Sequence, residues 1–281
     1  MIPPLSSLLV DDIVARALKE DLGDAGDITT QSTIPADKMI SAVVATRKSG
    51  VIAGVGLGRA ALRMTGAKTK TLVKNNDGAR VSPGDIILEI EGPARAILSA
   101  ERVALNFMGH LSGIATATAA LVDAVYGTDA KIVCTRKTTP GLRAFEKHAV
   151  RAGGGHNHRF GLYDAVMIKD NHIAASGGIT KALERARQAV GHTVKIEIEI
   201  DHVDQLEDAL SGGADIVLLD NMSTGDLARA VKLNNGRAVL EASGNVTVKT
   251  VRDIALSGVD IISSGWITHS APTLDLGMDF A

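Results

Sequence analysis

Residues 195–221 read KIEIEIDHVDQLEDALSGGADIVLLDN. A run rich in β-branched residues is followed by a helical pattern, with apolar residues three and four positions apart, and then by a second β-rich run. A chain that returns to the same end of a sheet through a helix forms parallel strands. This stretch therefore predicts an α/β fold built around a parallel sheet.

The same unit recurs from about residue 131 onward. Nearly every β-rich run ends in polar groups able to do chemistry, such as Lys169 with Asp170 and Asp220 with Asn221. A barrel gathers such groups from many strands at one rim, whereas an open sheet concentrates its site at one switch point. We therefore expect an incomplete, TIM-like α/β barrel of about six parallel strands. The runs occupy residues 131–138, 164–172, 195–200, 214–221, 238–245 and 259–266.

The first hundred residues follow another pattern. A helix is expected at about residues 8–21, followed by a turn-rich loop and by short runs that are separated by Gly and Pro turns. This alternation favours an α+β domain.

Composition limits the function classes. The chain has 281 residues, of which 45% are hydrophobic and 2% aromatic, and its formal net charge is −2. A nucleic-acid surface of basic patches and stacking rings is not expected, so any phosphate recognition must be local. The single cysteine, Cys134, excludes an internal disulfide and a cysteine-rich zinc site, and it fits a reducing compartment. Acidic Asp11 and Asp12 interrupt the N-terminus before it forms the apolar core of a signal sequence, which favours a cytoplasmic protein.

Residues 103–122 contain no Asp, Glu, Lys or Arg, and they include Gly109 and Gly113 at the spacing used by packed membrane helices. Polar side chains interrupt the run. We therefore expect a buried helix of a soluble protein, in which the glycines permit a close approach, and no contact with a membrane.

Charge is unevenly distributed along the predicted barrel. Between Thr135 and His172 there are seven Lys or Arg against three acids, whereas Glu197 to Asp220 holds eight acids and no Lys or Arg. Charges on helices usually form solvated faces. We expect this of Arg143, Glu146, Lys147, Arg151, Asp204, Glu207 and Asp208.

The charges on strands point to a site. Glu197 and Glu199 share one face of a strand whose other face is isoleucine, so both are predicted to point into the barrel. Buried carboxylates require cations or hydrogen bonds. Arg136, Lys137 and Arg159 are suited to anions, and the glycines of 153–155 offer backbone N–H groups. The expected ligand is polyanionic. Zinc held by His156, His158 and His172 is the rival interpretation, although their spacing is not that of helical ligands.

Five segments together resemble the quinolinate phosphoribosyltransferases, and HNHR with KDNH is the most specific part of the resemblance. It spans essentially the whole chain. The segments are GDITT (26–30), SAERVALNFMGHLSGIAT (99–116), TRKTTPGLR (135–143), GGGHNHRFGLYDAVMIKDNH (153–172) and EASGN (241–245).

The resemblance implies an N-terminal α+β sandwich-like domain at residues 1–112, joined by the C-terminal tail 270–281, and a barrel domain at residues 113–269. It implies transfer of a phosphoribosyl group from phosphoribosyl pyrophosphate to quinolinate with decarboxylation, giving nicotinate mononucleotide, pyrophosphate and CO2 in NAD biosynthesis. Mg2+ would accompany the pyrophosphate. The family forms homodimers, in which Arg102 resembles an arginine donated to the neighbouring site.

The resemblance also assigns roles by position. Arg136, Lys137 and Arg159 resemble the ligands of the quinolinate carboxylates, with Thr135 and His158 beside them. Lys169 resembles a lysine near the reacting centre. Glu199 and Asp220 resemble acids that face the ribose and the metal, although Glu197 is an alternative to Glu199. The phosphate loops would comprise Ser243, Gly244, Asn245, Ser264, Gly265 and Trp266.

Other functions remain open on the sequence. A Schiff-base aldolase could use Lys137 or Lys169 on the same barrel. An anion-binding sensor without turnover would need the same cations. A molybdenum-transport-associated group shares the fold, but HNHR and KDNH follow the quinolinate enzymes.

Overall fold

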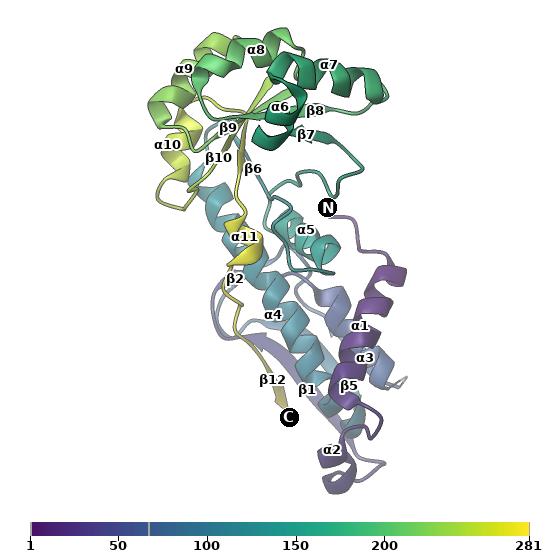
Figure 1. The fold of residues 1–281 in the computed structure, drawn as a ribbon. Coiled ribbons are helices and arrows are strands. Elements are labelled where there is room, and N and C mark those ends of the chain that lie inside the picture. The colour runs from purple at the N-terminus through teal and green to yellow at the C-terminus, as the bar shows by residue number, and fades with distance from the viewer. Residues whose placement is uncertain (1, 67, 281) are drawn as a thin grey trace. The chain divides into compact units, whose positions relative to one another are not determined.

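The computed structural model describes residues 2–66 and 68–280, which divide into two compact units (Figure 1). The N-terminal unit holds the residues up to 119, with 145–154 and those from 271 onward. The barrel unit holds residues 120–144 and 155–270.

Six parallel strands form the sheet of the barrel unit, in the order β6-β11-β10-β9-β8-β7. The first strand thus pairs with the last, as closure into a barrel requires, and the sheet is open between β6 and β7. In that gap a single parallel bridge joins Val133 to His156. The expected incomplete barrel is confirmed. The strands are β6 (Lys131–Val133), β7 (Val166–Ile168), β8 (Ile196–Ile200), β9 (Ile216–Asp220), β10 (Val239–Ser243) and β11 (Ile261–Ser263).

Isoleucine and glutamate alternate along β8, so the glutamates face the interior of the barrel. Ile196, Ile198 and Ile200 are buried at 0%, 0% and 1% exposure, and they lie on the face opposite to Glu197 and Glu199. The strands are shorter than the predicted runs: residues 134–138 and 169–172 leave the ladder, whereas Asp220 and Ser243 stay paired at the ends of β9 and β10. The helices that follow the strands are α6 (Asp170–Ser176), α7 (Ile179–Ala189), α8 (Leu206–Ser211, after the 3-10 turn Val203–Gln205), α9 (Thr224–Asn234), α10 (Val251–Leu256) and α11 (Trp266–His269).

The N-terminal unit is built on a four-stranded antiparallel sheet in the order β12-β1-β5-β3. Helices α1, α3 and α4 lie on one side of it (Figure 1). The C-terminal strand β12 pairs with β1, so the end of the chain completes this sheet. Its elements are α1 (Ser7–Leu22), α2 (Ile28–Thr33), β1 (Met39–Thr46), β2 (Gly50–Val51), α3 (Val55–Thr65), β3 (Lys70–Val73), β4 (Arg80–Val81), β5 (Ile86–Pro93), α4 (Ala94–Ala124), α5 (Arg143–Ala152) and β12 (Leu276–Phe280).

Helix α2 interrupts the loop that the sequence predicts after α1. The side chain of Asp27 accepts a hydrogen bond from the backbone N–H of Thr30 at 2.9 Å and so caps the helix. Six residues are too few for a periodic apolar pattern, which is why the helix was not predicted.

Two charged residues of α5 contradict the interpretation as a solvated face. Glu146 and Lys147 are both fully buried, and His110 Nε2 lies 2.9 Å from a carboxylate oxygen of Glu146. Burial of Glu146 is possible because it has this polar partner. Arg151, Asp204, Glu207 and Asp208 are exposed, as predicted.

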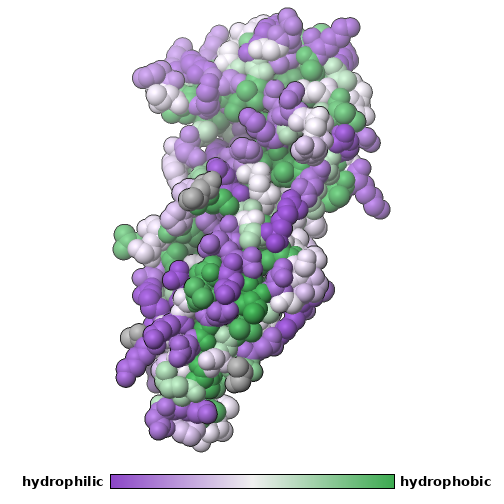
Figure 2. Space-filling view, turned by 180° about the vertical axis from the view of Figure 1, so that it is seen from behind, coloured by the Kyte–Doolittle hydropathy of each residue, from purple (hydrophilic) through white to green (hydrophobic). Residues whose placement is uncertain are grey.

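A groove of about 620 Å3 lies over the sheet of the N-terminal unit, and its apolar lining includes Val43, Leu72 and Phe280. In the view from behind, a cluster of hydrophobic residues lies among polar ones on this unit (Figure 2). The lining also includes the charged residues Lys70, Glu89, Glu91 and Asp279.

The central helix α4 carries the uncharged run. By length and composition it could cross a membrane, with a mean hydropathy of 1.2 over its most apolar 18 residues, but 67% of that window is buried inside the protein. The predicted domain division at residues 112 and 113 falls within this continuous helix. It stays a prediction.

The two glycines of α4 face the segment that leads to β12. The carbonyl oxygen of Gly109 accepts a hydrogen bond from Leu274 N at 3.0 Å. A Cβ atom on Gly109 would meet Leu274 O and a Thr273 methyl at 3.0 Å, and one on Gly113 would collide with the carbonyl oxygen of Pro272. The glycines therefore permit a close backbone approach in a buried helix, as the sequence predicts.

We expect Gly113→Ala to lower the free energy of unfolding by about 1–3 kcal/mol, because the new methyl group must displace the Pro272 backbone. The matched control is Gly56→Ala in α3, where a Cβ meets nothing within 4 Å. Alanine is the better helix former by roughly 1 kcal/mol, so the control should be neutral or stabilising. Urea unfolding measures both, and equal stabilities of the two variants would contradict the packing argument.

Candidate active site

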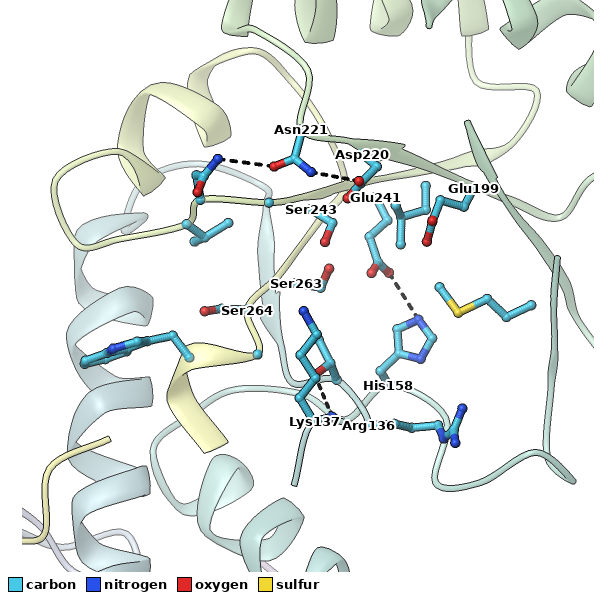
Figure 3. Close-up of a pocket in the computed structure, with 18 of the residues that line it drawn as sticks. Arg136, Lys137, His158, Glu199, Asp220, Asn221, Glu241, Ser243, Ser263 and Ser264 are labelled. Carbon is cyan, nitrogen blue, oxygen red and sulfur yellow. Dashed lines mark hydrogen bonds and ion pairs between the residues drawn. The ribbon is translucent and has the colours of Figure 1, made fainter. Parts of the chain in front are cut away.

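A cavity of about 780 Å3 is lined by residues at and beyond the C-terminal ends of the barrel strands (Figure 3). This volume lies within the range of ligand pockets, roughly 300–1,000 Å3. All predicted site residues except Arg102 line it. They are Thr135, Arg136, Lys137, His158, Arg159, Lys169, Glu199, Asp220, Ser243, Gly244, Asn245, Ser264, Gly265 and Trp266. Arg102 lies on α4 in the N-terminal unit, where it is exposed.

Two guanidinium groups define the cationic side. Among the described residues, the buried Nε atoms of Arg136 and Arg159 have no hydrogen-bond partner. Burial lowers the pKa of Arg159, and the neighbouring charge of Arg136 lowers it further. Cations packed in this way repel each other, so a bound anion would relieve an existing cost.

Arg143 braces the loops that carry these groups. Its Nε donates to Thr138 Oγ1 at 3.0 Å, Nη1 donates to the carbonyl of Phe160 at 3.0 Å, and Nη2 donates to the carbonyl of Arg136 at 3.4 Å. The interpretation of Arg143 as part of a solvated helix face is therefore wrong. One guanidinium group can donate hydrogen bonds to backbone carbonyls on two different loops. The spacing of residues along the sequence does not reveal such a contact.

Lys137 is held through its backbone. Its N–H donates to Thr135 Oγ1 at 3.0 Å, and its carbonyl accepts from Thr268 Oγ1 at 2.7 Å. A Cβ atom on Gly265 would meet the Lys137 side chain at 2.8 Å, so a larger residue there would displace this side chain. Gly265 therefore shapes the cationic side as well as the loop before α11.

Lys169 and His172 form the start of α6. The Lys169 ammonium pairs with Glu199, and His172 Nδ1 accepts the backbone N–H of Lys169 at 3.0 Å. This capping contact explains the histidine of the KDNH segment, because it fixes the residue from which the lysine side chain extends. His172 therefore positions Lys169 and does not line the cavity.

Asn221 ties the two loops on the acidic side. Its side chain donates to Asp220 Oδ2 at 2.8 Å and accepts from Asn245 Nδ2 at 3.2 Å (Figure 3). Asn221 and Asn245 have φ of 52° and 50°, and Gly244 has φ of 100°. A Cβ atom on Gly244 would also collide with the Asn221 side chain. From the sequence, Asn221 is predicted only as a polar residue at a strand end. Its contact with Asn245 could not be predicted, because it joins residues that follow different strands.

His158 and Glu241 line the bottom of the cavity, and Glu197 contacts His158 behind this lining; these three residues are called the floor. His158 Nε2 lies 3.0 Å from Glu197 Oε2 and 3.7 Å from Glu241 Oε2, and both carboxyl groups belong to residues that are only 2% exposed. Glu199 lines the cavity, whereas Glu197 does not. Glu241 was missed, although it shares the inward face of β10 with Ser243 and lies two residues before it.

Burial raises the pKa of Glu241 to about 7, and the charge of Glu197 acts in the same direction. Two carboxyl groups this close in a buried floor disfavour simultaneous ionisation.

The predicted zinc alternative is not formed. In the part of the chain that the structure describes, His158, Glu197 and Glu241 are the one group of histidine, cysteine and acidic residues close enough to share an ion. His156 instead bridges to β6, and His172 caps α6. The three histidines of the alternative therefore do not converge.

The arrangement can bind an anionic ligand between Arg136, Lys137 and Arg159 while presenting Glu199 and Asp220 to a second part of the ligand. Carboxylates at that position can stabilise a positive charge that develops during group transfer.

Comparison with known proteins identifies the family of the chain. The family model of the quinolinate phosphoribosyl transferase N-terminal domain matches residues 27–112, and that of the C-terminal domain matches residues 114–279. The chain is 44% identical to the probable nicotinate-nucleotide pyrophosphorylase (carboxylating) of Bacillus subtilis, over 98% of this chain and 94% of the relative. It is also 44% identical to the Mycobacterium leprae enzyme of that name, over 95% and 96% of the two chains.

Solved structures show the same similarity. NadC from Streptococcus pyogenes matches with a TM-score of 0.95 at 40% identity and covers 99% of both chains. Nicotinate-nucleotide pyrophosphorylase from Ehrlichia chaffeensis matches with a TM-score of 0.94 at 43% identity, over 99% of this chain and 100% of that one. On its sequence and its fold, the chain belongs to the quinolinate phosphoribosyltransferase family.

Proposed function

We propose that this protein transfers the phosphoribosyl group of phosphoribosyl pyrophosphate to the ring nitrogen of quinolinate, with loss of the adjacent carboxylate. The products are nicotinate mononucleotide, pyrophosphate and CO2, a step of NAD biosynthesis. The observation that carries the proposal is one cavity that joins Arg136, Lys137 and Arg159 to Glu199 and Asp220. The cationic residues suit the carboxylates of quinolinate, and the acidic residues suit the ribose of phosphoribosyl pyrophosphate.

The cationic half is the proposed quinolinate receptor. Arg136, Lys137 and Arg159 bind the carboxylates, and each charge-assisted hydrogen bond contributes about 1.5–3 kcal/mol. Thr135 fixes the loop through the Lys137 backbone. Both ring nitrogens of His158 already face protein groups, so this histidine supplies shape and orientation to the floor.

The acidic half is the proposed ribose site. Glu199 and Asp220 stabilise the positive charge that develops on the ribose as pyrophosphate leaves, an interaction that is stronger in the transition state than in the bound substrate. Lys169 sits beside the reacting centre through its pair with Glu199. The phosphate is held by the two loops with Ser243, Gly244, Asn245, Ser264, Gly265 and Trp266.

Mg2+ is the proposed cofactor, carried mainly by the pyrophosphate. Carboxylate oxygens and water are the ligands it prefers, and both Glu199 and Asp220 line the cavity. One oxygen of Glu199 bonds Lys169, and one of Asp220 bonds Asn221, which leaves the second oxygen of each without a partner among the described residues. When bound, the ion would neutralise charge on the leaving pyrophosphate.

A homodimer is proposed because Arg102 does not line the cavity of its own barrel unit, although the family resemblance places an arginine there. Its exposed side chain on α4 is free to reach a partner subunit.

A cytoplasmic location is proposed from the single cysteine, Cys134, which is buried. The names of some plant relatives place them elsewhere, as with the mitochondrial enzyme of Nicotiana tabacum and the chloroplastic enzyme of Oryza sativa.

The central test is an assay with quinolinate, phosphoribosyl pyrophosphate and Mg2+. We expect CO2 and nicotinate mononucleotide in equal amounts, and loss of both when EDTA removes the metal. Folded protein that forms no product would contradict the proposed function. Tight quinolinate binding without turnover would favour a sensor, and borohydride trapping of a carbonyl substrate on Lys137 or Lys169 would favour an aldolase.

The shared site predicts complementation between two inactive variants, Arg102→Ala and Lys137→Ala. A mixed dimer has one site in which both residues are intact, so random exchange of equal amounts should restore about a quarter of the activity. Mass spectrometry verifies that subunits have exchanged. Exchange without recovery would place Arg102 outside the partner's site.

His172→Ala should lower kcat/KM by about tenfold or more, because Lys169 loses the cap that fixes its backbone. His172→Asn can accept the same N–H and should recover part of the loss. Thermal unfolding separates this effect from general destabilisation, expected to be about 1 kcal/mol. If Asn and Ala behave alike in kinetics, the capping role is wrong.

A further inference from the structure

The contacts of His158 determine which of its ring nitrogens carries the proton. The backbone N–H of Arg159 donates to His158 Nδ1 at 2.8 Å, so that nitrogen carries a lone pair and no proton. The proton of the neutral ring is therefore on Nε2, which faces Glu197 at 3.0 Å and Glu241 at 3.7 Å. A metal ion on Nε2 would require the proton to move to Nδ1, where it would face the Arg159 N–H. The cluster is thus suited to a proton and not to a metal.

The two carboxyl groups cannot both be satisfied as anions. Glu197 and Glu241 are each 2% exposed, and in the described part of the chain their Oε1 atoms have no hydrogen-bond partner. The candidate ligand atoms of the two glutamates and His158 lie within 4.8 Å of one another. The Nε2–H group of His158 lies between the two carboxyl groups, the Glu241 carboxyl points toward it (Figure 3), and the Ser263 hydroxyl also faces Glu241, which still leaves the two Oε1 atoms without a donor among the described residues. A proton on one carboxyl would supply the missing donor.

The groups that face Glu241 from the surrounding elements favour placing that proton there. Glu197 on β8 is the acidic neighbour, whose charge disfavours a second anion. His158 and the Ser263 hydroxyl of β11 act in the opposite direction, while β9 presents the apolar Leu218 beside Glu241. Burial and the Glu197 charge prevail, with the pKa of Glu241 raised to about 7.

We propose that, on the acidic side of neutral pH, Glu241 is a neutral carboxylic acid in the protein without substrate, and that it positions Glu197 and His158 so that the cavity floor carries one negative charge instead of two. The proposal rests on quinolinate as the ligand of the cationic half. Glu197 lies close enough to Arg159 for its charge to act on that guanidinium. A second charge on the floor would repel a dicarboxylate and compete with it for Arg159.

Infrared spectroscopy of the protein without substrate tests the protonation directly. We expect the carbonyl band of a protonated carboxyl, which disappears as the pH rises through about 7 and is absent from Glu241→Gln at every pH. The control is Glu146→Gln, which alters another fully buried glutamate with a histidine partner and should keep the band. A band that persists in Glu241→Gln, or a wild type without one at pH 6, would overturn the proposal. This measurement does not depend on the reaction.

Kinetics test the role. In the wild type, KM for quinolinate should rise by about tenfold from pH 6 to pH 8.5, because Glu241 loses its proton and the floor gains a charge, while KM for phosphoribosyl pyrophosphate changes much less. In Glu241→Gln, which cannot ionise, KM for quinolinate should not rise over this range. Glu241→Ala lacks the hydrogen-bonding group and should bind quinolinate weakly at every pH. A KM that rises equally in the wild type and in Glu241→Gln would show that another group is responsible.

Discussion

The rest of the site depends on charge compensation inside the barrel. The alternation of β8 places isoleucines under the helices, and it thereby forces Glu197 and Glu199 into the interior. Neither carboxylate can stay there alone. Glu199 at the rim pairs with Lys169, and Glu197 in the floor pairs with His158. These two contacts connect β8 to the KDNH and HNHR segments.

On the cationic side of the cavity, by contrast, positive charges are packed together without an anionic partner for each in the described part of the chain. Arg136 and Arg159 are brought together by loops that Arg143 braces, and their buried Nε atoms have no partner among the described residues. Their mutual repulsion is a cost that the fold carries without a ligand. A bound dicarboxylate would offset it, so the charge pattern favours an occupied site. The loops with Asn221 and Asn245, in left-handed backbone conformations, hold the opposite wall in one shape.

Much of this could be predicted from the sequence, because the signals are local. The alternation of isoleucine and glutamate in β8 predicts that its glutamates point into the barrel. The polar residues at the ends of the six runs predict that the site lies at the rim of the barrel. What was missed depends on contacts between distant segments. Glu241 lies in a run that looks apolar, the fork of Arg143 reaches carbonyls on two loops, and the burial of Glu146 and Lys147 depends on how α5 packs. None of these contacts has a sequence period.

Arg136 and Arg159 are proposed to form the receptor of a dicarboxylate, and a crystal structure of the protein with quinolinate is the decisive measurement. We expect the ligand's carboxylates to lie within hydrogen-bond distance of both guanidinium groups, with the ring nitrogen directed toward Glu199 and Asp220. Quinolinate bound elsewhere, or with its carboxylates turned away from both arginines, would rule out this receptor.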